Sequence, residues 1–175
     1  MEHGGHHEEG HGPPDPMGKR IAVMASVLAV LLAVVTILSH REHTSAVMEK
    51  SEENDKWGEY QAKKIKMHEL EVGVDLITLM VAKSEPSDKK VEAYKEEIKR
   101  YGEESKEISK QAKEKEAEVK RAEARAAYFD LGEGLLEIGL VMSSLYFLGK
   151  KVLFPVVGGI AGLSGVVVAI MGLMK

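Results

Sequence analysis

Residues 21–39 form an apolar run that contains no charged side chain. A bilayer core about 30 Å thick is crossed by roughly 20 residues of α-helix, so this run suits one crossing. Lys19 and Arg20 precede it, and His40 and Arg41 follow it. A secretory signal peptide has a short polar leader and a small-residue cleavage site, and this run has neither. We therefore predict an uncleaved transmembrane helix over residues 19–39.

Two further apolar segments lie near the other end of the chain, at residues 130–149 and 152–174. Lys150 and Lys151 separate them, and a short basic connection between two apolar segments is typical of neighbouring membrane helices. We predict a second and a third transmembrane helix over these two ranges, joined by a tight turn.

Between the first and second apolar segments, residues 40–129 carry 19 Lys and Arg side chains against 21 Asp and Glu. Strong helix formers dominate this range, which we call the stalk. Its one clear break is at residues 84–87, where Pro86 disfavours helix before it and suits the start of the next helix. We predict two helices of about 65 Å each, paired as an antiparallel hairpin with its turn near 84–87. Two independent helices, or pairing with another chain, are the alternatives.

The second stalk helix carries apolar residues every three or four positions from Val91 to Phe129, and only Ser105 and Lys115 interrupt them. This period of 3.5 residues is typical of a coiled-coil seam. In the first stalk helix we expect the matching seam at Ala62, Ile65, Val72, Leu76 and Leu79.

The first stalk helix carries a second apolar stripe, formed by Leu70, Val74, Ile77 and Val81. A helix that is apolar on two faces needs a second partner. We interpret this stripe as a surface that contacts another protomer or another protein, and the alternative is a locally wide hairpin core. Trp57 and Tyr60 form a second candidate interaction patch, unless they pack in the seam.

Small residues recur every three or four positions in two of the predicted membrane helices, which permits close helix packing. In the last helix they are Gly158, Gly162, Gly165, Ala169 and Gly172, and in the first they are Ala22, Ser26, Ala29, Ala33 and Thr36. The pattern does not distinguish packing within one chain from packing between chains.

Asp130, Glu133 and Glu137 share one face of the second membrane helix by their spacing of three and four. We place Glu137 about one turn deeper than the other two, where an ionised carboxylate is costly and often functional. A cation or proton site is one interpretation of this acidic face. The other is an interfacial cluster that fixes the register of the helix.

The amino-terminal tail, residues 1–18, contains four histidines, four acids, three prolines and five glycines. It has too few apolar residues to offset the entropy of ordering, so we predict disorder. Its histidines form a possible weak metal site: His3, His6, His7 and His11. Incidental metal binding by a solvated tail is the alternative.

The composition excludes several classes of protein. The formal net charge of −4 argues against a nucleic-acid binder, and the absence of cysteine excludes disulfides, thiolate metal sites and a cysteine nucleophile. No phosphate loop and no nucleophile with a partner base is present. We therefore expect neither an enzyme nor a cofactor.

Residues 19–20 and 150–151 are basic and fall on one side of the membrane in this topology. Basic residues in short flanks favour the cytoplasm. We predict a multi-pass protein of the bacterial cytoplasmic (inner) membrane, with its amino terminus in the cytoplasm and its stalk outside. Arg41, Arg121 and Arg125 lie on the stalk side, where acids offset them.

Four features in this order resemble an uncharacterised bacterial membrane-protein family, domain of unknown function 4337. They are the His-rich and acidic tail before Gly18, the first apolar run, residues 54–66 around Trp57 and Tyr60, and residues 129–144. The resemblance covers most of the chain. It implies a bacterial integral membrane protein, and it implies no activity.

The sequence as a whole predicts an all-α membrane protein with three transmembrane helices and a long helical hairpin between the first and second. We expect a scaffold or protein-interaction module whose partners are the lipid bilayer, further copies of the chain and an unknown protein that binds the stalk. The alternative is a small channel or transporter subunit that uses Glu137.

Overall fold

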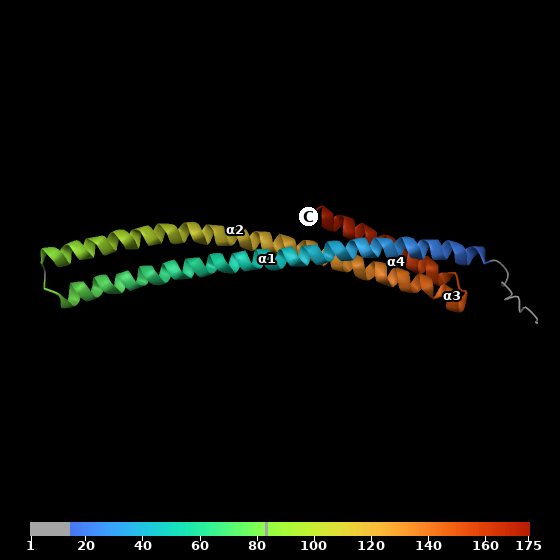
Figure 1. Ribbon diagram of the computed structural model, residues 1–175, viewed down its shortest axis with the longest axis horizontal. Coiled ribbons are helices and arrows are strands. Elements are labelled where there is room, and N and C mark those ends of the chain that lie inside the picture. Colours follow the sequence, from blue (N-terminus) through green and yellow to red (C-terminus); the bar gives the residue numbers. More distant parts are fainter. Residues whose placement is uncertain (1–14, 83) are drawn as a thin grey trace, which may run out of the picture. The chain divides into compact units, whose positions relative to one another are not determined.

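The computed structural model describes residues 15–82 and 84–175. Within them the chain forms the helices α1 (Pro16–Met80), α2 (Glu85–Ser144), α3 (Tyr146–Gly149) and α4 (Leu153–Leu173), and no strand (Figure 1). The prediction of an all-helical protein is confirmed. Among the described residues, three helical segments are long and apolar enough to cross a membrane: α1, α2 with α3, and α4.

Helix α1 begins at Pro16, so the last residues of the range predicted as a disordered tail are helical. Asp15 precedes the helix, and its Oδ1 atom accepts a hydrogen bond from the Gly18 backbone N–H at 2.8 Å. This is the geometry of an N-cap, and proline suits the first helical position because it has no N–H to satisfy.

Helix α1 ends at Met80 and α2 begins at Glu85, so the break lies slightly earlier than the predicted 84–87. Ser84 and Ser87 cap the start of α2 with a pair of reciprocal hydrogen bonds. The Ser84 N–H donates to Ser87 Oγ at 3.0 Å, and the Ser87 N–H donates to Ser84 Oγ at 3.4 Å. Ser84 thus occupies the N-cap position and Pro86 lies in the first turn, where proline is tolerated.

The chain divides into two compact units. Unit 1 comprises Met1–Ser39 and Ala127–Met174, and unit 2 comprises His40–Ala126 with Lys175. Helices α1 and α2 contribute to both units, whereas α3 and all of α4 belong to unit 1.

Unit 1 has an apolar core to which α1, α2 and α4 all contribute. Its buried members are Leu28, Val35, Phe129, Leu136 and Ala169. The opposite faces of these helices expose large apolar side chains, including Val30 on α1 and Leu163 on α4. Unit 1 is therefore apolar on its inside and on its outside.

In unit 2, α1 and α2 lie side by side and run in opposite directions (Figure 1). Ion pairs join Glu42 to Arg125, Glu49 to Lys115, and Lys63 to Glu104. Residues later in α1 pair with residues earlier in α2, so the two helices are antiparallel. On α2, the positions of the predicted seam from Val91 to Ala126 are all buried or half-buried.

The prediction of the seam on α1 is wrong. Ile65, Leu76 and Leu79 were expected to face α2, but they are 59%, 52% and 81% exposed, and Ala62 and Val72 are exposed as well. The stripe that we assigned to an outside partner lies inward instead, because Leu70, Val74 and Ile77 are half-buried. Its last member, Val81, lies beyond the end of α1 and is exposed.

Charged side chains explain this error. The half-buried stripe continues toward residue 42 through positions spaced by three and four, and several of them are Glu or Lys. They are Glu42, Glu49, Glu53, Lys56 and Lys63, of which Glu42, Glu49 and Lys63 form ion pairs with α2. A search for apolar residues cannot follow a seam of this kind.

Candidate functional site

Hydroxyl groups of α1 satisfy two of the three carboxylates on the predicted acidic face. Thr36 Oγ1 donates a hydrogen bond to Glu133 Oε1 at 2.7 Å, and Ser39 Oγ donates to Asp130 Oδ1 at 2.6 Å. Ser39 is almost completely buried. These two bonds tie α1 to α2 within unit 1, and they fix the relative register of the two helices.

Glu137, the third member of the acidic face, is exposed and has no hydrogen bond or ion pair with any residue that the structure describes. The structure therefore does not bring the three carboxylates into one site. Within residues 15–82 and 84–175, no group of three or more His, Cys, Asp and Glu side chains is arranged to hold a metal ion. The candidate metal ligands His3, His6, His7 and His11 lie outside the described residues.

The stripe of small residues on α4 is buried throughout, at Gly158, Gly162, Gly165, Ala169 and Gly172. It lies against the backbone of α2. A Cβ atom added to Gly139 would stand 2.8 Å from the carbonyl oxygen of Gly158, and one added to Gly165 would stand 2.7 Å from that of Gly132. The two helices approach so closely that neither glycine has room for a side chain.

Sequence reasoning missed the half of this contact that α2 contributes. Gly132, Leu136, Gly139 and Ser143 are spaced by four, three and four, and all four are buried. The spacing by three and four that identified the stripe on α4 is also present in these residues of α2. By contrast, four of the five small residues on α1 are exposed, at Ala22, Ser26, Ala29 and Ala33, and Thr36 is half-buried.

A polar cluster that sequence reasoning also missed forms around Asp15 in unit 1. Its carboxylate accepts the N-cap hydrogen bond from the Gly18 N–H and forms an ion pair with Lys150 Nζ at 2.9 Å. The Tyr146 hydroxyl lies 3.3 Å from Asp15 Oδ1. The Gly18 N–H and then Lys150 hold the pKa of Asp15 below its usual value. An aspartate before proline signals an N-cap, but its partners 131 and 135 positions away leave no local signal.

Lys115, which interrupts the predicted apolar seam, gathers three carboxylates in unit 2. Its Nζ atom lies 2.8 Å from Glu118, 2.7 Å from Glu52 and 3.1 Å from Glu49. The hydrogen bonds that Lys115 donates to Glu118, Glu52 and Glu49 raise its pKa well above its usual range. Lys115 also holds the pKa of Glu118 below its usual value. The interruption is thus an electrostatic contact between the helices.

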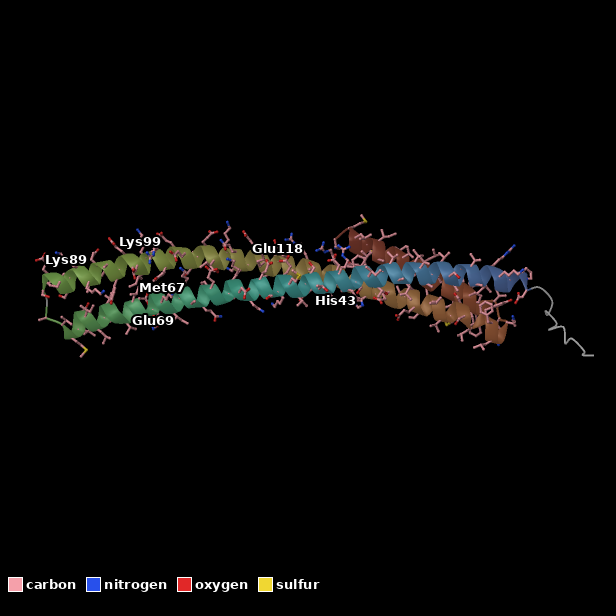
Figure 2. All side chains as sticks on the ribbon, viewed as in Figure 1. His43, Met67, Glu69, Lys89, Lys99 and Glu118 are labelled. Carbon is pink, nitrogen blue, oxygen red and sulfur yellow. The ribbon has the colours of Figure 1, made fainter. Side chains whose placement is uncertain are left out.

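Trp57 and Tyr60 are half-buried on α1, with their rings edge to face and their centroids 5.6 Å apart. Trp57 is the only tryptophan of the chain. Tyr60 lines an open groove of about 800 Å³ between α1 and α2 in unit 2. Figure 2 labels Met67, another residue of this groove.

In a comparison with protein families, residues 17–175 match the family described as Domain of unknown function (DUF4337). No curated protein and no solved structure matches the chain.

Proposed function

Because the chain belongs to the DUF4337 family, a domain of unknown function, we propose its role from the structure. The protein is a membrane-anchored helical stalk that acts as a scaffold or protein-interaction module and assembles with further copies of itself. Unit 1 is the anchor, in the cytoplasmic membrane of a bacterium. The stalk is an antiparallel helical hairpin on the extracytoplasmic side, and the amino terminus is cytoplasmic.

One observation carries this proposal: the apolar stripe that α1 leaves uncovered on unit 2. We call it the outer stripe, and it comprises Ile65, Val72, Leu76 and Leu79. These residues are spaced by seven, four and three, which is the period by which one helix packs against another. Large apolar side chains grouped on the exposed face of a helix indicate a surface that another protein covers. A second copy always supplies an identical stripe, so it is the occupant that we propose.

The apolar outside of unit 1 supports the anchor. Among the large side chains that it exposes are Val23 and Val30 on α1 and Ile160 and Leu163 on α4. Water disfavours such a surface, whereas lipid tails accept it without cost. The two hydroxyl-carboxylate bonds from Thr36 and Ser39 support the same assignment, because polar groups in a membrane pair with one another.

Cysteine cross-linking tests the oligomer, because the chain has no cysteine of its own. Leu76→Cys places a thiol on the outer stripe, and Ile77→Cys, the matched control, places one on the half-buried inner face one residue away. Oxidation in native membranes should give a covalent dimer from Leu76→Cys and little from Ile77→Cys. Monomer from both variants would show that no second copy covers the outer stripe.

The side of the membrane is tested with Lys89→Cys. Lys89 is exposed near the start of α2, and it takes no part in the hydrogen bonds between Ser84 and Ser87 (Figure 2). A membrane-impermeant maleimide should label this variant in intact cells as well as in lysed cells. Labelling only after lysis would place the stalk in the cytoplasm and reverse the proposed orientation.

A small channel or transporter subunit is the second candidate, and exposed Glu137 favours it. A carboxylate without a partner is costly in a membrane, unless it lines a water-filled path or meets another chain. Ion flux into proteoliposomes that Glu137→Gln abolishes would support this function. Equal ion flux into liposomes that contain the wild type, liposomes that contain Glu137→Gln and empty liposomes would exclude a channel or transporter function.

A further inference from the structure

The groove between α1 and α2 has a floor of small and apolar residues. Tyr60 and Met67 come from α1, and Gly102, Ser105, Ser109 and Ala117 come from α2. Gly102 carries no side chain beside Met67, and a Cβ atom added to it would stand 3.9 Å from the Met67 sulfur, at van der Waals contact. The small side chains on α2 thus create a hollow that larger ones would fill.

Lysines surround this floor. Lys64 of α1 and Lys106, Lys110 and Lys113 of α2 line the groove, together with a single acid, Glu114. We call this site the lysine groove. Glu114 lies 4.0 Å from Lys110, and no carboxylate of the described residues lies within 4 Å of Lys64, Lys106 or Lys113.

This excess of positive charge is local. The stalk as a whole has slightly more acids than bases, and many of its other lysines are paired, as Lys50 is with Glu53 and Lys120 with Glu116. A groove in which four lysines outnumber one acid, above a floor of small and apolar residues, therefore favours a ligand that is both apolar and acidic.

The dimensions of the lysine groove favour a helix. Its lining on α2 extends from Gly102 to Ala117, which corresponds to about 22 Å of helix. Lys106, Lys110 and Lys113 follow one another by four and three along α2. Acids on a docked helix with the same spacing would lie opposite them, and the apolar face of that helix would lie on the floor.

We propose that the lysine groove binds an amphipathic helix of a partner protein, with an apolar face and acidic edges. This inference rests on the proposed role of the stalk as an interaction module, but it concerns a different surface from the outer stripe. The stripe selects another copy of the chain, whereas the groove selects a partner of opposite charge.

A peptide-binding experiment on the full-length chain in a neutral detergent tests the proposal. The probe is a tryptophan-free helical peptide of about 18 residues, with a Leu and Ala face flanked by glutamates, and its control carries Gln in place of each Glu. Trp57 contacts Tyr60 of the floor, so its fluorescence reports binding. The acidic peptide should bind in low salt and weaken as salt rises, and the Gln peptide should bind much more weakly.

Matched charge variants locate the binding site. Lys106→Gln with Lys113→Gln removes two groove lysines, and we expect a loss of affinity of about tenfold. Lys95→Gln with Lys99→Gln removes the same charge from exposed positions of α2 outside the groove lining, and should leave the affinity unchanged. Lys99 is labelled in Figure 2. Ser109→Leu fills the floor without altering charge, and it should weaken binding while the circular dichroism spectrum stays helical.

Three results would overturn the proposal: equal loss from the two charge variants, equal affinity for the two peptides, or unchanged affinity in Ser109→Leu. A short-chain anionic lipid that binds through Lys106 and Lys113 when the acidic peptide does not would also overturn it, and would identify a lipid as the occupant. Cross-linking through Leu76→Cys does not depend on the lysine groove. Failure of the groove alone would therefore leave the proposed oligomeric stalk standing.

Discussion

Helices α1 and α2 contact their neighbours through different chemistry in the two units. In unit 1, glycines of α2 lie directly against the backbone of α4, and buried apolar side chains fill the remaining space. In unit 2, α1 and α2 are joined by a narrow seam that includes Lys115 with its three carboxylates and the pair of Arg125 with Glu42. Close backbone packing joins the helices of unit 1, whereas ion pairs complete an apolar seam in unit 2.

This difference is what the proposed anchor and stalk require. Lipid tails are as apolar as leucine, so helices in a membrane gain little from burying leucine and associate by close packing instead. Helices in water gain from even a narrow apolar seam, and charged side chains can complete it because their outer atoms remain solvated. The contrast predicts that the two units respond to different substitutions.

The largest effect should come from filling the contact between α2 and α4. In Gly139→Leu the added Cβ atom would meet the Gly158 carbonyl oxygen, so the helices must separate, and unfolding should become easier by about 3 kcal/mol. The matched control is Gly134→Leu on the same helix, because a Cβ atom at Gly134 meets nothing within 4 Å.

Unfolding of both variants by dodecyl sulfate, followed by circular dichroism, measures this effect. Equal destabilisation by the two substitutions would mean that helix propensity, and not contact with α4, sets the outcome.

A smaller effect should distinguish the two stripes of α1 in unit 2. Ile77→Ala removes apolar contact from the half-buried face, and we expect a loss of about 1 to 2 kcal/mol. Leu76→Ala removes a side chain that is 52% exposed, and the loss should stay below about 0.5 kcal/mol. The measurement is urea unfolding at a protein concentration low enough to keep the chain monomeric. A larger loss of unfolding free energy in Leu76→Ala than in Ile77→Ala would mean that α1 contacts α2 through the face that we first predicted.

Acid should weaken unit 2 through the cluster around Lys115. The pKa of Glu118 is lowered, so its contribution to stability is present above its unfolded value near 4.5 and is lost as the pH falls through the folded value. The melting temperature should therefore fall at acidic pH, and it should fall less in Lys115→Met, which lacks the cation that Glu118 needs. Parallel pH profiles for the two proteins would show that this cluster adds nothing to stability.

The smallest effect should come from the start of α2. Ser84→Ala removes the hydroxyl that accepts the Ser87 N–H, and such a substitution costs about 1 kcal/mol or less. Hydrogen exchange at the first turn of α2 should quicken, while exchange near Ala112, which is fully buried, should not change. Ser51→Ala, at an exposed position within α1, is the control and should alter neither.

Much of the fold could be predicted from the sequence, because apolar length and helix-forming composition are local properties. The all-helical class and the three apolar helices follow from them, whereas the family was identified by resemblance, at residues 54–66 and 129–144 among others. The inward face of α1 could not be predicted in the same way. Two apolar stripes compete there, and the face that packs inward continues through Glu49 and Lys63, whose partners lie on α2.

The candidate sites divide along the same line. The buried stripe on α4 is visible in the spacing of its glycines. The hydrogen bonds of Asp130 and Glu133 with Ser39 and Thr36, and the cluster around Asp15, depend on residues about a hundred positions away. Spacing within one helix can place carboxylates on a common face, but it cannot tell which of them a distant hydroxyl satisfies.

The antiparallel contacts also suggest an order of folding. The sequence separation of the paired residues is 41 for Lys63 with Glu104, 66 for Glu49 with Lys115, and 97 for Thr36 with Glu133. Each closed contact shortens the loop that the next one must close, so pairing should begin near residues 81–84 and proceed toward Thr36. Helix α4 follows α1 and α2 in the sequence and is therefore synthesised after them, so the polar pairs of α1 and α2 should form first and provide the surface against which α4 packs.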